Sequence, residues 1–373
     1  MAITEYQALA RKYRPQTFDE VVGQKHVIAA LRNTIDSERI HHAYLLTGTR
    51  GIGKTTIARI IAKCLECKDG ISSHPHDDGN LCDNCKAIIT GSFPDVIEID
   101  AASQTKVEDT RQLLENTQYP PIAGRYKVYI IDEVHMLSTS SFNALLKTLE
   151  EPPSYVKFIL ATTDPHKIPV TVLSRCLQFQ LKALSIDEIK DQIKKICGKE
   201  GIPCEDDAAA LIARSAKGSM RDALSLCDQA IALGSGSLLR DCVIDMLGTA
   251  GDELIVSLLE ILKPGSDADL AAFLENVRKS CPNYKNLLDE IVSCFHDLAL
   301  YQLVNQGKLS IFSFPLEILE QYAPVFAPES LQLYYQISLQ AVEENTVAPD
   351  SASVFEMMVL RLLAFTPQKK KFG

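Results

Sequence analysis

The sequence contains, at residues 48–55, the run Gly48-Thr49-Arg50-Gly51-Ile52-Gly53-Lys54-Thr55, which fits the pattern G-x-x-x-x-G-K-[ST] at every fixed position. Glycines in such a loop let backbone N–H groups turn toward phosphate oxygens, the lysine adds a positive charge, and the last hydroxyl can hold Mg²⁺. An apolar segment, 43–46, precedes the run, and a helix with one apolar face follows it. This context predicts a phosphate-binding P-loop, with the residues of the run and Thr56 as its nucleotide contacts, rather than a glycine turn without a ligand.

Length and composition predict a globular, cytoplasmic protein. The 373 residues are enough for about two or three domains, each able to bury a core. The sequence has no apolar run of about 18 residues and no basic-then-apolar N-terminus, so neither a membrane span nor a secretory signal is expected. In the cytoplasm, the 11 cysteines are expected as core residues, metal ligands or free thiols rather than disulfides.

The net charge of −10 is unevenly distributed. Residues 1–182 carry 21 basic and 21 acidic side chains, whereas residues 183–373 carry 17 and 27. A neutral first half can still present a local basic face to a phosphate backbone, so the balance neither favours DNA binding nor argues against it.

Apolar strands alternate with helices through the first half of the chain. Helices are expected at 24–37, after the P-loop, at 107–116 and after Ser138, and strands at 43–46, 96–100, 127–131, 156–161 and 177–181. This alternation predicts an α/β P-loop domain over residues 1–182, with a parallel sheet covered by helices on both faces. A polar, cysteine-containing insertion at 67–85 interrupts it.

From Ser185 the pattern is helical only. The spacing Ser185…Glu188 is that of a capping box, and about four helices up to residue 248 predict a small lid domain at 183–248. Long amphipathic runs at 284–304, 329–343 and 353–364 predict an all-α domain at 249–367, followed by a disordered basic tail at 368–373.

Two acidic residues, Asp132 and Glu133, close an apolar strand about 80 residues after the P-loop. In P-loop ATPases an Asp at this place organises Mg²⁺, and the following Glu polarises the attacking water. An acidic turn without a function is the alternative, which the P-loop upstream disfavours. Thr163 ends the fourth strand, expected between the Asp132 strand and the P-loop strand, and is a candidate sensor of the γ-phosphate or a plain turn residue.

Two arginines are further candidates. Arg175, just before the fifth strand, can face the nucleotide of a neighbouring subunit and stabilise charge on the transferring phosphoryl group, or can form a surface salt bridge. Arg221, at the start of a lid helix, can reach the γ-phosphate, or can be a solvated charge. The residues alone leave both alternatives open.

Together these motifs resemble the AAA+ clamp-loader ATPases. The resemblance is carried by residues 11–15, 22–24, 48–55, 132–137, 161–164, 174–176 and 218–222. With the cysteine-rich insertion, essentially the whole chain looks like the gamma/tau family of bacterial DNA polymerase III. The resemblance implies Lys54 and Thr55 for phosphate and Mg²⁺, Asp132 for Mg²⁺, Glu133 for water activation, Thr163 as sensor 1, Arg175 as a finger acting in trans, and Arg221 as sensor 2.

The resemblance also implies an activity and partners. An ATPase domain, a lid and a helical collar would form a ring with delta and delta-prime subunits and further gamma/tau copies. ATP binding would let the ring open the beta sliding clamp at primer–template DNA, and hydrolysis would release it; no membrane is involved, and polymerase activity would lie in another subunit. Two rival functions remain: another AAA+ DNA motor, such as a branch-migration helicase, and a non-hydrolysing structural subunit of the ring.

The insertion departs from the family pattern. The pairs Cys64-x-x-Cys67 and Cys82-x-x-Cys85 have spacing close to that of a four-cysteine zinc site, but Cys64 lies on the apolar stripe of the P-loop helix and is expected in the core. The family pattern, Cys-x₈-Cys-x₂-Cys-x₂-Cys, begins here at Cys67 and has His76 in place of its second cysteine. We therefore expect a structural Zn²⁺ site from Cys67, His76, Cys82 and Cys85, with His74 and Cys64 as alternative ligands and a site without metal as the remaining possibility.

Overall fold

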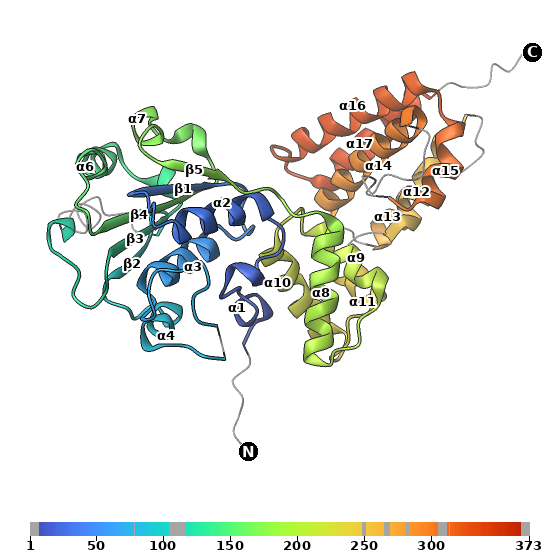
Figure 1. Ribbon diagram of the computed structural model, residues 1–373. Coiled ribbons are helices and arrows are strands. Elements are labelled where there is room, and N and C mark those ends of the chain that lie inside the picture. Colours follow the sequence, from blue (N-terminus) through green and yellow to red (C-terminus); the bar gives the residue numbers. More distant parts are fainter. Residues whose placement is uncertain are drawn as a thin grey trace, which may run out of the picture. The chain divides into compact units, whose positions relative to one another are not determined.

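The computed structural model describes residues 7–77, 79–103, 116–247, 251–264, 269–280, 283–304, 312 and 314–366. The chain divides into two compact units, Met1–Leu238 and Leu239–Gly373 (Figure 1). The expected helix at 107–116, apart from Asn116, and the expected tail at 368–373 lie outside the described residues. The boundaries expected after residues 182 and 248 stay predictions.

A five-stranded parallel sheet forms the centre of the first unit. The strand order is β2 (Val96–Asp100), β3 (Lys127–Asp132), β4 (Val156–Thr162), β1 (Ala43–Thr47) and β5 (Leu177–Gln180). The three central strands, β3, β4 and β1, are mostly apolar and buried along almost their whole length, as is typical of parallel strands covered on both faces, whereas the edge strands β2 and β5 are more exposed. Thr47 lies opposite Thr162, and Asp100 opposite Asp132, so the carboxyl ends of neighbouring strands are level.

Helices cover both faces of this sheet, as the sequence predicts (Figure 1). On one face α2 (Lys25–Asp36) and α3 (Lys54–Glu66) pack against alternate strand residues such as Leu46 and Ile130. On the other face α6 (Thr139–Glu150) and α7 (Val170–Leu173) pack against the intervening residues, such as Leu45 and Ile131. The alternation along each strand therefore separates two cores.

Several short elements were not predicted from the sequence. They are α1 (Leu9–Lys12), α4 (Asp83–Thr90), α7, and the 3₁₀ turns η1 (Phe18–Glu20), η2 (Asn116–Gln118), η3 (Val134–Met136) and η4 (Pro165–Lys167). Such elements are too short for a helical period to be recognised. The helix α4 starts inside the segment that we expected to be an irregular insertion, with Cys82 as its N-cap residue.

Three helices complete the first unit: α8 (Ile186–Glu200), α9 (Asp206–Ser215) and α10 (Met220–Leu233). The capping box that begins α8 is present, because the Ser185 side chain accepts from Glu188 N–H and the Glu188 side chain accepts from Ser185 N–H. Ser219 caps α10 by accepting from Asp222 N–H, and this cap fixes where the following Arg221 emerges.

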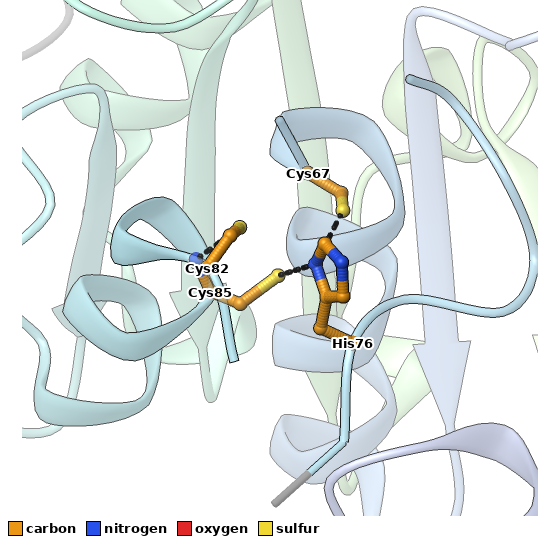
Figure 2. A group of neighbouring side chains, drawn as sticks. All are labelled: Cys67, His76, Cys82 and Cys85. Atoms are coloured by element: carbon orange, nitrogen blue, oxygen red, sulfur yellow. Dashed lines mark hydrogen bonds between the residues drawn. The ribbon is translucent and has the colours of Figure 1, made fainter. Parts of the chain in front are cut away.

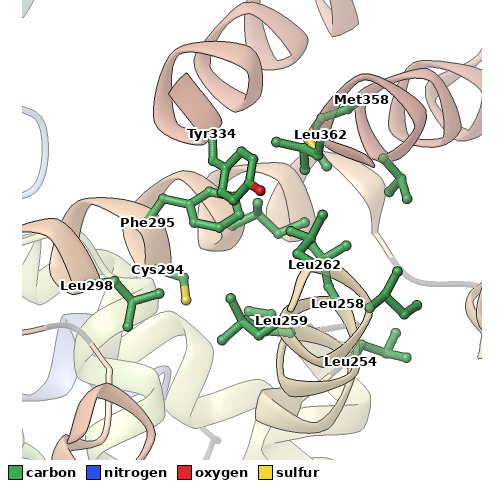
Figure 3. Close-up of a cluster of buried hydrophobic side chains, with 14 of the residues drawn as sticks. Leu254, Leu258, Leu259, Leu262, Cys294, Phe295, Leu298, Tyr334, Met358 and Leu362 are labelled. Carbon is green, nitrogen blue, oxygen red and sulfur yellow. The ribbon is translucent and has the colours of Figure 1, made fainter. Parts of the chain in front are cut away.

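In the second unit, helices are the only regular secondary structure among the described residues, as predicted. It contains α11 (Arg240–Leu247), α12 (Gly251–Leu262), α13 (Leu270–Ser280), α14 (Tyr284–Val304), α15 (Leu316–Tyr322), η5 (Ala323–Val325), α16 (Pro328–Asn345) and α17 (Ser351–Ala364). In its core the rings of Phe295 and Tyr334 join α14 to α16, with centroids 5.5 Å apart, beside Leu262 of α12 and Met358 of α17 (Figure 3). Among the described helices, none is both long and apolar enough to cross a membrane.

Candidate functional site

A cavity of about 460 Å³ opens at the carboxyl edge of the sheet, beside the P-loop. Its volume lies within the range of about 300–1,000 Å³ that is usual for small-ligand sites. Residues 50–56 of the P-loop line it, together with Asp132 and Glu133 from the end of β3 and Arg221 from α10. Residues from three separate segments therefore meet around one space that is large enough for a nucleotide.

Lys54, the first residue of α3, is buried and turned back into the P-loop. Its ammonium group donates to the carbonyls of Gly48 and Thr49, each at 2.9 Å. Burial lowers the pKa of Lys54, while Glu133 and Asp132 act in the opposite direction. The ammonium group is thus buried and held in place by carbonyls of the loop. A cation in this position can bind a polyanion such as a phosphate chain.

The Thr55 hydroxyl donates to Asp132 Oδ2 at 2.6 Å. This contact joins the beginning of α3 to the end of β3. It is possible because β1, which leads into α3, and β3 lie on either side of β4 and end at the same edge of the sheet. A hydroxyl and a carboxylate oxygen so close together are hard donors of the kind that Mg²⁺ prefers. The two side chains therefore suit the metal ion that accompanies nucleotide phosphates.

Glu133 follows β3 in a left-handed conformation, with φ of 47°, and its carboxylate is oriented by neighbours. Thr163 donates to Glu133 Oε2 through its backbone N–H at 3.1 Å and its hydroxyl at 2.8 Å. His135 Nδ1 lies 3.3 Å from the same oxygen and 3.0 Å from Thr162 Oγ1. The carboxylate thus lines the cavity, and the residue that directly follows β4 holds it in place through hydrogen bonds.

The helix α10 begins directly on the P-loop. Arg221 N–H donates to Gly51 O at 3.3 Å, and a Cβ added at Gly51 would lie 1.9 Å from Ser219 Oγ. Gly51 also has φ of +77°, so both its conformation and this close approach require glycine. The contact places Arg221 at the cavity wall.

Arg175 lies elsewhere in the same unit. It precedes β5 and so stands at the amino edge of the parallel sheet, opposite the P-loop. Its guanidinium donates to Thr171 O and to Glu150 Oε1, each at 2.8 Å. Among the described residues, those that line the cavity do not include Arg175 or Thr163. Of the residues predicted to hold Mg²⁺ or act in hydrolysis, five line the cavity: Lys54, Thr55, Asp132, Glu133 and Arg221. Thr163 contacts one of them, Glu133, and Arg175 lies away from the cavity.

Some cavity residues were missed by reasoning from the sequence. Tyr13 and Arg14 follow α1 and line the cavity, and burial, then the neighbouring Arg59, lowers the pKa of Arg14. The same arm contacts the lid, since Leu9 N–H donates to Asp228 Oδ2 at 2.9 Å. The sequence offered one signal for this role: a cation and an aromatic residue in the proline-containing arm that precedes the helix expected at 24–37. Apolar lining comes from Val21, Val22, Leu184, Met220 and Leu224.

A second site is formed by the four side chains that the sequence analysis selected as metal ligands (Figure 2). The ligand atoms of Cys67, His76, Cys82 and Cys85 all lie within 4.8 Å of one another. Cys67 directly follows α3, Cys82 caps α4, and Cys85 lies in the first turn of α4. His76 comes from the loop between these helices.

The donor set fits zinc. Bonds of about 2.3 Å to sulfur and about 2.0–2.1 Å to nitrogen place the ligand atoms of a tetrahedral site about 3.5–3.8 Å apart. His76 Nδ1 lies 3.1 Å from Cys67 Sγ and 4.0 Å from Cys85 Sγ. Burial disfavours the Cys82 thiolate, but hydrogen bonds, first from Cys85 N–H, hold the pKa of this thiol at about 6, whereas burial and then Cys82 raise the pKa of the Cys85 thiol to about 12. Thiolates are the form that binds zinc, so the cluster is suited to a structural ion.

The two alternative ligands lie apart from this cluster. Cys64 is fully buried in the core between α3 and the sheet, as its place on the helix stripe predicts. His74 is exposed, and its Nδ1 lies 3.6 Å from Asp19 Oδ2.

The cluster of Cys67, His76, Cys82 and Cys85 is connected to the strand that carries Asp132. Arg125, two residues before β3, donates through its guanidinium to the carbonyls of Cys67 and Lys68. Its backbone N–H donates to the buried carboxylate of Glu66 at 2.8 Å. A side chain at Gly124 would displace the Glu66 carboxylate, since an added Cβ would lie 2.3 Å from Glu66 Oε2. The insertion is therefore docked on the α/β core.

Three family models match successive parts of the chain. Residues 23–185 match "DNA polymerase III, delta subunit", residues 188–236 match "DNA polymerase III clamp loader subunit, ATPase lid domain", and residues 238–371 match "DNA polymerase III subunits gamma and tau domain III". The matches lie in the order of the α/β sheet, the following helices and the second unit.

Curated relatives match over nearly the whole chain. The tau subunit of DNA polymerase III from Escherichia coli is 51% identical over 97% of this chain and 56% of its own length. The gamma subunit from Buchnera aphidicola subsp. Baizongia pistaciae is 43% identical over 96% of each protein. The chain thus spans just over half the length of tau relatives such as the first, and nearly all of the gamma relative.

Solved structures are more distant. The branch-migration motor RuvB of Thermotoga maritima is 22% identical, over 71% of this chain and 85% of its own, with a TM-score of 0.48. The clamp-loader delta protein of Bacillus subtilis is 14% identical, over 90% and 99%, with a TM-score of 0.38. These similarities support no argument about function. The matches to the gamma and tau sequences do: the chain belongs to the gamma/tau family of DNA polymerase III subunits.

Proposed function

We propose that this chain is the ATP-hydrolysing subunit of the clamp loader of a bacterial DNA polymerase III holoenzyme, acting in the cytoplasm. The observation that carries the proposal is a hydrolytic set, Lys54, Thr55, Asp132 and Glu133, gathered at one cavity in a member of the gamma/tau family. A subunit that only binds nucleotide has no use for a carboxylate positioned to activate water.

The proposed nucleotide contacts are Gly48 to Thr56 of the P-loop. Lys54 would meet the β- and γ-phosphates, and Thr55 with Asp132 would hold Mg²⁺, which neutralises phosphate charge when bound. The cavity volume and the acidic and basic donors around it fit MgATP. The apolar residues Val21, Val22 and Leu224 are suited to the base, because a purine ring needs an apolar wall.

Glu133 is the proposed general base. Its carboxylate can accept a proton from water, and Thr163 fixes the carboxylate through two hydrogen bonds to Oε2. Through this contact Thr163 can report the state of the γ-phosphate, the role expected of sensor 1. Arg221 can act as sensor 2, because its position at the start of α10 links the lid to the P-loop.

Arg175 is proposed to act on the nucleotide of a neighbouring subunit. It stands at the sheet edge opposite its own P-loop, so a role in its own cavity has no geometric support. The proposed assembly contains delta and delta-prime subunits and further gamma/tau copies, held by a helical collar at residues 249–367, with residues 1–182 and 183–248 as ATPase domain and lid. Its proposed substrates are the beta sliding clamp and primer–template DNA.

Zn²⁺ is the proposed occupant of the cluster of Cys67, His76, Cys82 and Cys85. Four protein ligands leave zinc no open position, so the ion would supply a structural crosslink and no chemistry. Arg125 would then connect this crosslinked insertion to the α/β core.

The ATPase rate of the assembled ring, measured with and without sliding clamp and primed DNA, tests the proposed function. A clamp loader is expected to be stimulated most when clamp and primed DNA are both present. Stimulation by DNA alone would favour a branch-migration helicase, and no hydrolysis in any assembly would favour a structural subunit.

A further inference from the structure

We propose that Asp69 positions the metal ligand His76. Its carboxylate accepts the Nε2–H of His76 and so holds the imidazole in the tautomer and orientation that direct Nδ1 toward the zinc ion. The proposal rests on the proposed zinc site and goes beyond it, because it assigns the ligating nitrogen and adds a residue that contacts no metal. Asp69 is a positioning residue in this arrangement.

The two ring nitrogens of His76 face different partners. Nε2 lies 2.8 Å from Asp69 Oδ2. Nδ1 faces the thiols instead (Figure 2), at 3.1 Å from Cys67 Sγ and 4.0 Å from Cys85 Sγ. A neutral imidazole carries one N–H, and a carboxylate can only accept. The proton therefore belongs on Nε2, which leaves the lone pair of Nδ1 directed toward the thiols. This is the neutral form in which histidine binds a metal.

A tight turn brings Asp69 to the ring. Gly70 N–H donates to Cys67 O at 3.2 Å, which closes a turn from Cys67 to Gly70 with Asp69 at its third position. Gly70 has φ of +120°, a conformation that residues with side chains rarely adopt. The same turn thus supplies both the first thiol of the site and the carboxylate behind the histidine.

The ion pair on its own would contribute little to stability. The side chain of Asp69 is 76% exposed, although that of His76 is only 14% exposed. Exposed pairs contribute about 0–1 kcal/mol. Behind a metal ligand the same contact has a larger effect, because a carboxylate that accepts the N–H of the non-ligating nitrogen orients the ring and raises its basicity. Loss of such a partner typically costs about 10–100-fold in metal affinity.

A cysteine at position 76 would have no use for Asp69. A thiolate has no second nitrogen to orient, and a nearby carboxylate would only add negative charge to a site with four thiolates. The effect of Asp69 on zinc affinity should therefore depend on the histidine. This dependence separates positioning through His76 from a general effect of charge or of loop folding.

The experiment measures zinc affinity of the full chain by chelator competition. Asp69→Ala should weaken zinc binding about 10–100-fold, and Asp69→Asn should weaken it less, since the amide oxygen still accepts the hydrogen bond without the charge. The matched control is Asp77→Ala, which removes the same charge from the same loop, where Asp77 accepts from Gly79 N–H. The control should bind zinc like the parent chain.

The second arm repeats Asp69→Ala in a His76→Cys chain, where it should not weaken zinc binding. An equal loss in both backgrounds, or no loss in the parent, would overturn the proposal. In the zinc-bound chain, ¹⁵N NMR of labelled histidine should find Nδ1 metal-bound and Nε2 protonated; metal on Nε2 would also overturn it.

Failure of this proposal is distinguishable from failure of the proposed function. A parent chain that binds no zinc would overturn both the zinc site and the role of Asp69, yet clamp-stimulated ATP hydrolysis could still be measured. Zinc binding that ignores Asp69 would overturn the positioning role alone.

Discussion

Thr163 and Glu133 are joined by two hydrogen bonds to a single oxygen: the backbone N–H and the hydroxyl of Thr163 both donate to Glu133 Oε2. The orientation of the proposed base therefore depends on the end of a neighbouring strand. Hydrogen bonds to a charged group contribute about 1.5–3 kcal/mol, enough to hold one rotamer of the carboxylate.

Thr163→Val keeps the shape of this side chain and removes its hydroxyl donor. We expect kcat for ATP hydrolysis to fall about tenfold or more with little change in ATP affinity, because only the base is released. Thr34→Val, the same change in α2, is the control, and steady-state ATPase assays measure both. An unchanged kcat in Thr163→Val would show that the hydroxyl contact does not position Glu133.

Glu133→Gln should retain ATP and stall its hydrolysis. The amide preserves the size of the side chain but cannot take a proton from water, and loss of a general base typically costs about 10²–10⁴-fold. Equilibrium binding of ATP together with single-turnover hydrolysis measures the two effects separately. Normal turnover would remove Glu133 from the proposed role.

Lys54→Ala should abolish tight ATP binding. The substitution removes the buried ammonium group that the carbonyls of Gly48 and Thr49 hold at the phosphate cradle. Calorimetric titration with MgATP measures the affinity, and a thermal melt checks that the chain is folded. Micromolar affinity in a folded variant would contradict the assignment of the P-loop.

Arg175→Ala should slow hydrolysis in the assembled ring by up to about 10³–10⁵-fold while the isolated chain is nearly unaffected. The control is Glu150→Gln, which removes the partner that Arg175 pairs with inside this chain and leaves the guanidinium in place. ATPase rates are measured for the ring and for the isolated chain. Arg175→Ala should lower the rate of the ring alone, and Glu150→Gln should lower neither rate. An equal fall in both would mean that Arg175 acts in its own subunit.

His76→Ala should weaken or abolish zinc binding, whereas Cys64→Ala should still bind about one zinc ion per chain. Cys64 is fully buried in the core, so its truncation should lower the free energy of unfolding by about 1 kcal/mol without touching the cluster. Metal analysis and thermal unfolding measure these effects. The reverse pattern would make Cys64 the fourth ligand.

Much of the fold was predictable from the sequence, because it depends on local patterns. The P-loop, the apolar strands and the capping box at Ser185 each have a short-range signature, and the structure confirms these elements. The short helices α1 and α4 were not predictable, since a helix of four or eight residues has too few turns to reveal a period.

The contacts within the candidate site were harder to predict. The bond from Thr163 to Glu133 depends on the register of β3 against β4, and no local pattern encodes the side-chain rotamers. The place of Arg14 at the cavity depends on an arm that folds back across the unit. The proximity of His76 to the thiols could be predicted only from the ligand spacing of the family that the chain resembles, because a loop has no periodic pattern.

The strand order also has a consequence for how the chain folds. β1, which leads into the P-loop, pairs with β4 and β5, both of which follow it much later in the sequence. A chain emerging from the ribosome cannot complete the ladder of β1 until residue 180 has been made. Such non-local pairing folds slowly, whereas helical bundles fold fast. We therefore expect the P-loop to become ordered late during synthesis, and a chain interrupted before residue 156 would leave β1 without either of its neighbouring strands.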